Sequence, residues 1–257
     1  MPELPEVETV RRVLEERLRG LRITAYKLGQ PTFYRRPPDL KHLIGSTVEF
    51  VRRRGKYLVV GVSGRRELVL HLGMSGRLAF GAAGPHLRFQ LMLQGEILGF
   101  HDARRFGRVG CPLPELGPEP LDSCFDPAYL HKALHDRKAP IKALLMDQRI
   151  VAGIGNIYAT ESLFQAGIKP RRPAGRLSKP EMARLVKAIK TVLRRAVKLG
   201  GSTLEDAAYL DPLGRPGRFQ KRVSVYGRSV GACGHALKAT RKPISGRTSL
   251  FCPICQK

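Results

Sequence analysis

Five prolines fall within the seventeen residues from 111 to 127, and this run limits how the chain can fold more than any other feature. Proline has no amide hydrogen and a fixed φ, so neither a helix nor a central strand continues through such a segment. The 257 residues are enough to bury two hydrophobic cores. We therefore predict that residues 112–127 form a linker between two folding units.

The two sides of this linker differ in their apolar patterns. Before it, short apolar runs separated by Gly-containing turns are typical of strands. These runs are residues 21–28, 47–53, 57–62, 67–72, 87–93 and 96–100. After it, apolar residues recur every three or four positions, which predicts helices at 141–146, 157–166 and 179–199. The sequence thus predicts a β domain followed by a helical part that ends near Leu210.

The N-terminus combines a helix signal with an unusual chemical group. Apolar residues at helical spacing predict a helix over about 5–19, which would fix the start of the chain against the β domain. Removal of Met1 would leave Pro2 with a free secondary amine beside the carboxyl group of Glu3. An α-amino group titrates near pH ~8 and can act as a nucleophile at neutral pH. Alternatively, the proline and the acidic residues merely start the helix, a position that favours both.

The charge of the chain restricts its partners. Lys and Arg number 46 and Asp and Glu 21, a formal net charge of +25. Such a surface favours a polyanion, and nucleic acid is the usual one. A ribosomal-type basic protein and a protein bound to an anionic membrane are the alternatives. No apolar run approaches the ~20 residues of a spanning helix, and the N-terminus lacks the apolar core of a signal peptide. We expect a soluble intracellular protein.

Several short motifs occur in a characteristic order along the whole chain. They are Pro2-Glu3-Leu4-Pro5-Glu6-Val7-Glu8-Thr9, Arg53-Arg54-Gly55-Lys56-Tyr57-Leu58, His71-Leu72-Gly73-Met74-Ser75-Gly76, Asp102-Ala103-Arg104-Arg105-Phe106-Gly107, Met146-Asp147-Gln148 with Gly153-Ile154-Gly155-Asn156-Ile157-Tyr158, Gly200-Gly201-Ser202-Thr203-Leu204 and Val225-Tyr226-Gly227-Arg228. In this order the chain resembles the formamidopyrimidine-DNA glycosylases, bacterial enzymes that excise oxidised purines. The resemblance implies an α+β fold of two domains. A β-sandwich with flanking helices would span 1–111, a helix-two-turn-helix domain 128–224, and a zinc-finger β-hairpin 225–257.

The resemblance also implies a bifunctional glycosylase and AP lyase of base excision repair that removes 8-oxoguanine and formamidopyrimidines. Pro2 would attack C1′ of the damaged nucleoside, displace the base and form a Schiff base, and Glu3 would transfer protons. Lys56 would contact phosphate and donate a proton during β-elimination. Arg247 would bind the phosphates that flank the lesion and assist δ-elimination. The product would be a one-nucleotide gap with phosphates on both ends.

Reaching C1′ requires turning the nucleotide out of the duplex, which leaves a gap in the base stack. The resemblance implies that Met74, Arg104 and Phe106 fill this gap as a wedge. The DNA contacts that it implies are His86, Arg104, Lys138, Lys142, Asn156 and Tyr226. Asn156 also follows a Gly-rich turn and precedes an apolar run, so we predict a helix N-cap that can receive a phosphate. The implied partner is double-stranded DNA with oxidised purines or abasic sites. We expect a monomer in the bacterial cytoplasm, associated with the nucleoid through DNA.

The finger segment departs from the family's two Cys-x-x-Cys pairs. The pair Cys252 and Cys255 is intact, but Val230 stands where a cysteine is expected before Cys233. His235 is the nearby substitute, and three thiolates with one imidazole suit tetrahedral zinc. We predict one structural zinc bound by Cys233, His235, Cys252 and Cys255. A metal-free hairpin and an adventitiously oxidised cysteine pair are the alternatives.

Two other functions are compatible with parts of the pattern. An endonuclease VIII-type enzyme, which removes oxidised pyrimidines, shares the nucleophile but usually has glycine where this chain has Leu4, and it lacks a wedge of the Met74 type. A protein that recognises lesions without cutting would have no need of Pro2, Glu3 and Lys56 together. The residues present therefore favour an enzyme that acts on oxidised purines.

Overall fold

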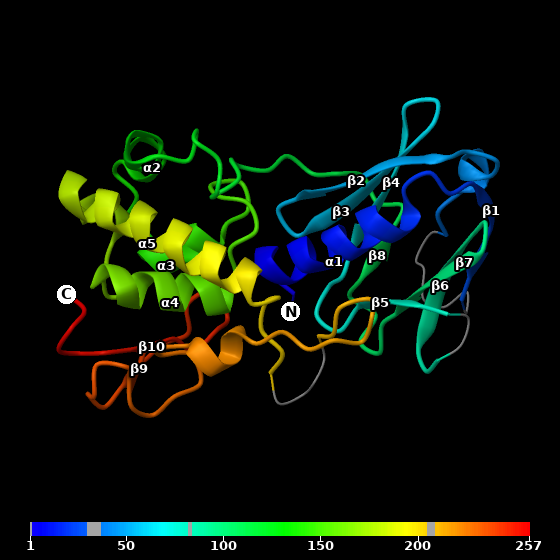
Figure 1. Cartoon of the computed structure of the whole chain (residues 1–257). Coiled ribbons are helices and arrows are strands. Elements are labelled where there is room, and N and C mark those ends of the chain that lie inside the picture. Colours follow the sequence, from blue (N-terminus) through cyan, green and yellow to red (C-terminus); the bar gives the residue numbers. More distant parts are fainter. Residues whose placement is uncertain (1, 30–36, 82–83, 205–208) are drawn as a thin grey trace. The chain divides into compact units, whose positions relative to one another are not determined.

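The computed structural model describes residues 2–29, 37–81, 84–204 and 209–257. The chain forms two compact units (Figure 1). One comprises the residues up to Pro114 together with Val197–Gln220, and the other comprises Glu115–Ala196 and Lys221–Lys257. The boundary between the first stretch of one unit and the other unit falls after Pro114, within the proline-rich run. The segment Val197–Gln220, which we expected in the helical domain, instead packs with the N-terminal unit.

The first unit contains two four-stranded antiparallel sheets. The order β1-β6-β7-β5 joins Ile23–Leu28, Leu87–Leu93, Glu96–His101 and Arg77–Phe80, and the order β2-β3-β4-β8 joins Val48–Arg54, Tyr57–Val62, Arg66–His71 and Arg108–Val109. All six predicted strands are present. The strands β5 and β8 were not predicted, because two to four residues show too little alternation to be recognised.

A single apolar core joins both sheets to the first helix. Helix α1 (Leu4–Leu18) packs against β2 and β3. Its buried stripe includes Val7, Val10, Leu14 and Leu18, which belong to the same cluster as residues of both sheets. The predicted helix and its role as an anchor for the N-terminus are therefore confirmed.

The second unit is mainly helical. Its helices are α2 (Pro127–Leu134), α3 (Ile141–Met146), α4 (Asn156–Ala166) and most of α5 (Lys179–Lys198), with a short 3-10 helix, η3, at Ala174–Arg176. The three predicted helices are present within one residue of the expected bounds. Helix α2 was not predicted; it begins at Pro127, and Asp126 caps it by accepting a hydrogen bond from the Tyr129 N–H at 2.6 Å.

The C-terminal hairpin has two very short strands, β9 (Lys238–Ala239) and β10 (Leu250–Phe251). Side-chain hydrogen bonds attach this hairpin to the helices. The Gln256 amide donates to Ile168 O at 2.7 Å, and its oxygen accepts from Cys252 N at 2.8 Å. Gln256 therefore links the hairpin to the segment that follows α4.

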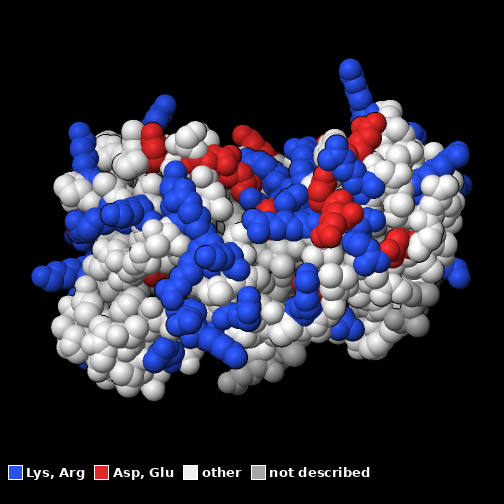
Figure 2. Space-filling model, viewed as in Figure 1, with Lys and Arg blue, Asp and Glu red and all other residues white. Residues whose placement is uncertain are grey.

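Basic side chains are spread over the face shown in Figure 2, and the acidic ones gather in smaller groups. Among the described residues, no helix is both long enough and apolar enough to cross a membrane.

Candidate active site and DNA-binding residues

Pro2 and Glu3 are buried at the start of α1, and Glu3 is 2% exposed. Glu3 and Glu6 form a reciprocal capping box, in which the Glu3 N–H donates to Glu6 Oε2 at 2.8 Å. The other Glu6 oxygen accepts from Ser202 N at 2.7 Å. At Gly201 a Cβ would lie 2.6 Å from Glu6 Oε1, so the motif needs glycine there. Met1 is outside the described residues, and its removal stays a prediction.

Lys56 lies in the tight turn between β2 and β3 and is 6% exposed. Arg53 connects this turn to α1, because its guanidinium donates both to Gly55 O at 3.1 Å and to Glu8 Oε2 at 3.2 Å. Burial raises the pKa of Glu8, but hydrogen bonds from Arg11 and the charges of Arg11 and Arg53 outweigh it and hold that pKa below its usual range. The Lys56 turn is thus fixed to the second turn of the helix that carries Pro2.

His71, at the end of β4, is a residue that the sequence analysis did not single out. Its pKa is lowered to about 4, first by burial and then by the charges of Lys56 and Arg108. The imidazole is therefore neutral at physiological pH. Nδ1 accepts from the Gly73 N–H at 3.2 Å, so the ring hydrogen is on Nε2. His71 is a neutral hydrogen-bond donor in the electrostatic field of Lys56.

The predicted wedge residues come from two loops that the structure joins directly. The buried Asp102 accepts from Ser75 Oγ at 2.5 Å and from Gly107 N at 2.7 Å, and Ser75 Oγ accepts from Arg104 N at 3.0 Å. A Cβ at Gly73, where φ is +65°, would lie 2.5 Å from the Phe106 backbone. The loop of Met74 is therefore held against the loop of Arg104 and Phe106.

Two of the three predicted wedge side chains, Arg104 and Phe106, are exposed, and Met74 is half-buried. Phe106 is 54% exposed, and the guanidinium of Arg104 lies 5.4 Å from the centre of its ring. His86 is also exposed. It lies beside the same region, because its carbonyl oxygen accepts a hydrogen bond from Asp102 N at 3.0 Å. The structure thus brings His86 close to the wedge loops, as a shared contact surface would need.

In the second unit, Lys142 and Asn156 are in direct contact. Lys142 is fully buried, and its Nζ donates to Asn156 Oδ1 and to Ser249 Oγ, both at 2.7 Å. Asn156 is the first residue of α4, and Gly155 occupies the N-cap position, so the predicted capping role of Asn156 is wrong by one residue. The helix instead begins after Gly155, which has an extended backbone, and Lys142 orients the Asn156 amide.

Arg247 follows a tight turn at the end of the hairpin. Ile244 and Arg247 exchange backbone hydrogen bonds at 2.8 and 3.0 Å, and Ser245 and Gly246 between them both have positive φ. Such a turn holds the two strands in a fixed register. Ser249, which binds Lys142, lies two residues further along. The position of Arg247 is therefore set by the hairpin and by its attachment to α3.

Tyr226 and Lys138 have different surroundings in the same unit. Glu161 is 3% exposed and accepts three backbone N–H groups, from Ser224 at 2.7 Å, Val225 at 2.9 Å and Tyr226 at 2.8 Å. Tyr226 is thus held by a buried carboxylate of α4. Lys138 is exposed in the segment between α2 and α3. That these two residues contact DNA stays a prediction.

The four predicted metal ligands lie together in the hairpin. Their donor atoms are all within 4.8 Å of one another. Cys233 Sγ lies 3.7 Å from Cys252 Sγ, and His235 Nδ1 lies 3.6 Å from Cys252 Sγ and 3.4 Å from Cys255 Sγ. Tetrahedral zinc with ordinary bond lengths requires S···S edges of about 3.8 Å and S···N edges of about 3.5 Å. The cluster has the size and the chemistry to hold a metal ion.

The contacts of four residues of the site could not have been found in the sequence by the same reasoning. His71, Ser75 and Asp102 stand within the quoted motifs, but only the fold shows which partners they bind. Glu161 lies in an apolar helical run that resembles ordinary core. No pattern in the sequence marks it as the acceptor for residues 224–226.

Comparison with known proteins identifies the family. A model of the formamidopyrimidine-DNA glycosylase N-terminal domain matches residues 1–109, and a model of the formamidopyrimidine-DNA glycosylase H2TH domain matches residues 116–208. The chain belongs to the formamidopyrimidine-DNA glycosylase family. This is a family of DNA glycosylases of base excision repair, and the predicted fold of an N-terminal domain followed by an H2TH domain is confirmed.

Relatives and solved structures cover the whole chain. Formamidopyrimidine-DNA glycosylases of Thermus thermophilus and Laribacter hongkongensis are each 44% identical to it, covering 100% of the chain and 98% and 100% of the relatives. The crystal structure of the MutM (FPG) protein of Thermus thermophilus matches with a TM-score of 0.91 and 43% identity over 99% of this chain and 98% of that one. Fpg of Lactococcus lactis in complex with DNA containing an abasic site matches with a TM-score of 0.88 and 31% identity over 99% of each chain.

Proposed function

We propose that the chain is a bifunctional DNA glycosylase and AP lyase that excises oxidised purines with Pro2 as the nucleophile. The observation that carries this proposal is the anchoring of the N-terminus by Glu6, which binds Glu3 N with one oxygen and Ser202 N with the other. A frayed chain end could not hold an amine at a reacting carbon, whereas a fixed one lowers the barrier by several kcal/mol.

The chemistry follows from the properties of a secondary amine. The lone pair of the Pro2 nitrogen attacks C1′, the glycosidic bond breaks, and the base leaves with a proton. Proton transfer to the sugar ring oxygen, by Glu3, opens the ring and gives an iminium ion. The iminium withdraws electrons, so loss of a C2′ proton expels the 3′ phosphate and a second elimination expels the 5′ phosphate. Each broken C–O bond leaves its electron pair on phosphate, which gives a one-nucleotide gap.

The remaining residues have roles that match their surroundings. Lys56 would bind a phosphate and supply a proton, and the neutral His71 would donate Nε2–H to the same anionic backbone. Met74, Arg104 and Phe106 would occupy the space of the extruded nucleotide. Asn156 and Arg247 would bind phosphates, with Lys142 orienting Asn156. Removal of a base from the stack costs a few kcal/mol, which the inserted wedge offsets in part.

We further propose that the metal of the hairpin is zinc, bound by Cys233, His235, Cys252 and Cys255. A Cys₃His set with no open position suits a structural role, in which the ion holds the hairpin that carries Arg247. The ion itself takes no part in the reaction at the sugar.

Borohydride trapping tests the proposed nucleophile. Incubation with an 8-oxoguanine duplex and borohydride should reduce the Schiff base to a covalent adduct on the N-terminal peptide, located by mass spectrometry. Glu3→Gln should form the adduct more slowly, while Glu49→Gln, an exposed acidic residue on β2, should behave like the unchanged chain. An adduct on Lys56 or on another side chain would disprove the role of Pro2.

Excision assays test the proposed substrate. The chain should release 8-oxoguanine opposite cytosine faster than it releases thymine glycol, because it has Leu4 and the Met74 wedge. Wild-type Lactococcus lactis Fpg has been crystallised with DNA containing an oxidised pyrimidine, so the comparison of rates is more informative than either assay alone. A preference for thymine glycol would favour the endonuclease VIII-type function.

A further inference from the structure

One cavity of the first unit lies on the outer side of α1. Its volume is about 600 Å³, and it is lined by one face of the helix and by two segments of Val197–Gln220. The helix contributes Thr9, Arg12, Val13 and Glu16; Val13 is buried, and the other three lie outside the buried stripe that faces the sheets. No residue to which the proposed reaction assigns a role lines this cavity.

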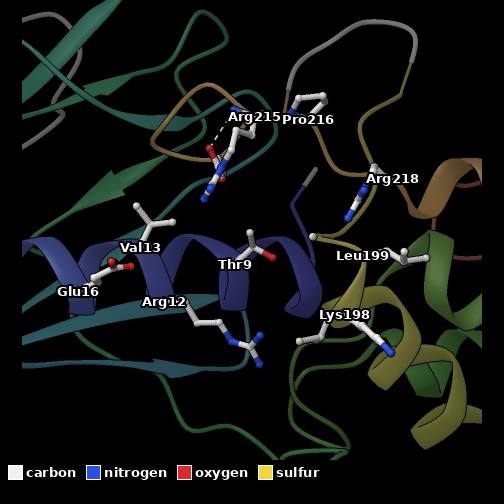
Figure 3. A pocket seen from close by; sticks show the side chains of 12 residues that line it. Thr9, Arg12, Val13, Glu16, Lys198, Leu199, Arg215, Pro216 and Arg218 are labelled. Carbon is white, nitrogen blue, oxygen red and sulfur yellow. Dashed lines mark hydrogen bonds and ion pairs between the residues drawn. The ribbon is translucent and has the colours of Figure 1, made fainter.

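Basic side chains dominate its polar lining. They are Arg12, Lys198, Arg215 and Arg218, whose side chains are drawn around the cavity in Figure 3. The acidic residues that line the cavity are only two, Glu16 and Asp211. Lys198 and Arg218 form no ion pair with another residue in the described part of the chain. The cavity therefore has an excess of positive charge that the protein itself does not neutralise.

The backbone that carries these cations is fixed by hydrogen bonds. Asp211 is 5% exposed; its Oδ1 accepts from Leu213 N and Arg215 N at 2.9 Å, and its Oδ2 accepts from Arg215 Nε at 2.7 Å. Arg218 N donates to Leu199 O at 3.0 Å, which joins the two segments. Arg12 binds Glu8 through Nε at 3.0 Å. Both paired arginines use Nε in these contacts, so their terminal NH₂ groups can bind a ligand.

We propose that this cavity binds the phosphate group of a nucleotide-sized ligand. Three guanidinium groups and one ammonium group suit a tetrahedral oxyanion, because the arginine fork binds two oxygens of a phosphate at once. A volume of about 600 Å³ is larger than one phosphate needs and lies within the range of ordinary small-molecule pockets. The phosphate comes either from a free nucleotide or from the backbone of a DNA strand. The proposed binding of phosphate in this cavity does not depend on whether the chain excises bases.

Calorimetry on the full chain at physiological salt tests the site with defined probes. Deoxyadenosine 5′-monophosphate should bind, and deoxyadenosine, which lacks the phosphate, should not. The double variant Lys198→Gln, Arg218→Gln should weaken binding of the monophosphate at least about tenfold, since two charge-assisted contacts are lost. The control is Arg194→Gln, Arg195→Gln, two exposed cations of α5 that do not line the cavity and whose loss changes the net charge equally. It should change the affinity less than about twofold, because exposed charges outside the cavity are screened.

Binding of undamaged duplex DNA to the same two double variants identifies the source of the phosphate. Equal DNA affinities of the two variants, with monophosphate binding lost in only the cavity variant, indicate a free nucleotide. A greater loss of DNA affinity in the cavity variant indicates a DNA phosphate. Equal loss of monophosphate binding in both variants, or no binding by the unchanged chain, overturns the proposal. Borohydride trapping of both variants keeps this outcome separate from that of the proposed glycosylase, because neither variant removes a residue with a proposed role in the reaction.

Discussion

Pro2 and Arg247 are both proposed to act on the same nucleotide, yet different forces hold them in place. Pro2 precedes a helix whose apolar stripe joins the core of two sheets. Arg247 lies on a hairpin whose strands have two residues each, and we propose that a metal ion in the cluster of Cys233, His235, Cys252 and Cys255 keeps this hairpin ordered, together with hydrogen bonds to the rest of its unit. The first arrangement depends on burial of apolar surface and the second on coordination and polar contacts. Treatments that affect one should therefore leave the other largely intact.

Loss of the metal should have the largest effect, and only on the hairpin. Structural zinc sites contribute on the order of 10 kcal/mol to the order of small domains. His235→Ala should remove about one equivalent of zinc in elemental analysis, make residues 225–257 sensitive to protease, and abolish strand cleavage. The β-sheet circular dichroism of the first unit should persist.

The control for this experiment is Cys124→Ser, which removes an exposed thiol outside the cluster and should change neither metal content nor cleavage. Unchanged zinc content and activity in His235→Ala would show that another group completes the site or that the hairpin is held by packing alone.

Substitution of one of two buried carboxylates, one in each unit, should have a smaller effect than loss of the metal, and the effect on stability should be similar in the two units. Glu6 and Glu161 each accept backbone N–H groups on both oxygens. Glutamine has one oxygen, so Glu6→Gln or Glu161→Gln places an NH₂ group against an N–H donor. Each should cost about 1–3 kcal/mol of unfolding free energy in urea titrations.

The two variants should differ in function. Glu6→Gln should slow trapping at Pro2 while DNA affinity changes little, and Glu161→Gln should weaken DNA binding because it releases Tyr226. Equal effects of both variants on trapping and on binding would contradict the division between the two regions.

The sequence predicted the regular parts of the fold well and the connections between them poorly. Apolar periodicity located six strands, α1 and α3 to α5, because these elements bury a continuous face. Strand β8 and helix α2 were missed, since one has two residues and the other starts at a proline that also fits a linker. The ligands of the candidate metal site were predicted from the resemblance to the family's finger and from the chemistry of His235, and the structure places these four residues together. The contacts of Asp102, Lys142 and Glu161 could not, because they join residues far apart in the chain.

His71 provides a prediction for the first unit that depends on pH. In the unfolded chain it titrates near pH 6.5, and in the fold its pKa is about 4, because burial and neighbouring cations disfavour the charged ring. Above pH 6.5 both states are neutral and stability is unaffected. As the pH falls toward 4, the unfolded state binds a proton that the folded state does not, so stability declines.

The expected loss is about 2 kcal/mol between pH 7.5 and 5, measured by urea unfolding. His71→Gln should remove this dependence, and His42→Gln, an exposed histidine of the 3-10 helix Lys41–Leu43, should retain it. An equal slope in His71→Gln would assign the pH dependence to other groups.

The smallest expected effect separates two lysines of the second unit. Lys138 is exposed and Lys142 is buried between Asn156 and Ser249, so they should contribute to DNA binding by different means. Each phosphate contact adds roughly 0.9 to the slope of log affinity against log salt concentration on duplex DNA. Lys138→Gln should flatten that slope by about this amount and weaken the binding of damaged and undamaged DNA equally. Lys142→Met should destabilise the hairpin attachment and lower DNA affinity with less change of slope, because its charge is already committed to partners within the protein. Equal flattening of the slope by Lys142→Met and Lys138→Gln would contradict this expectation. It would mean that the Lys142 ammonium group leaves Asn156 and Ser249 and contacts a phosphate when DNA binds.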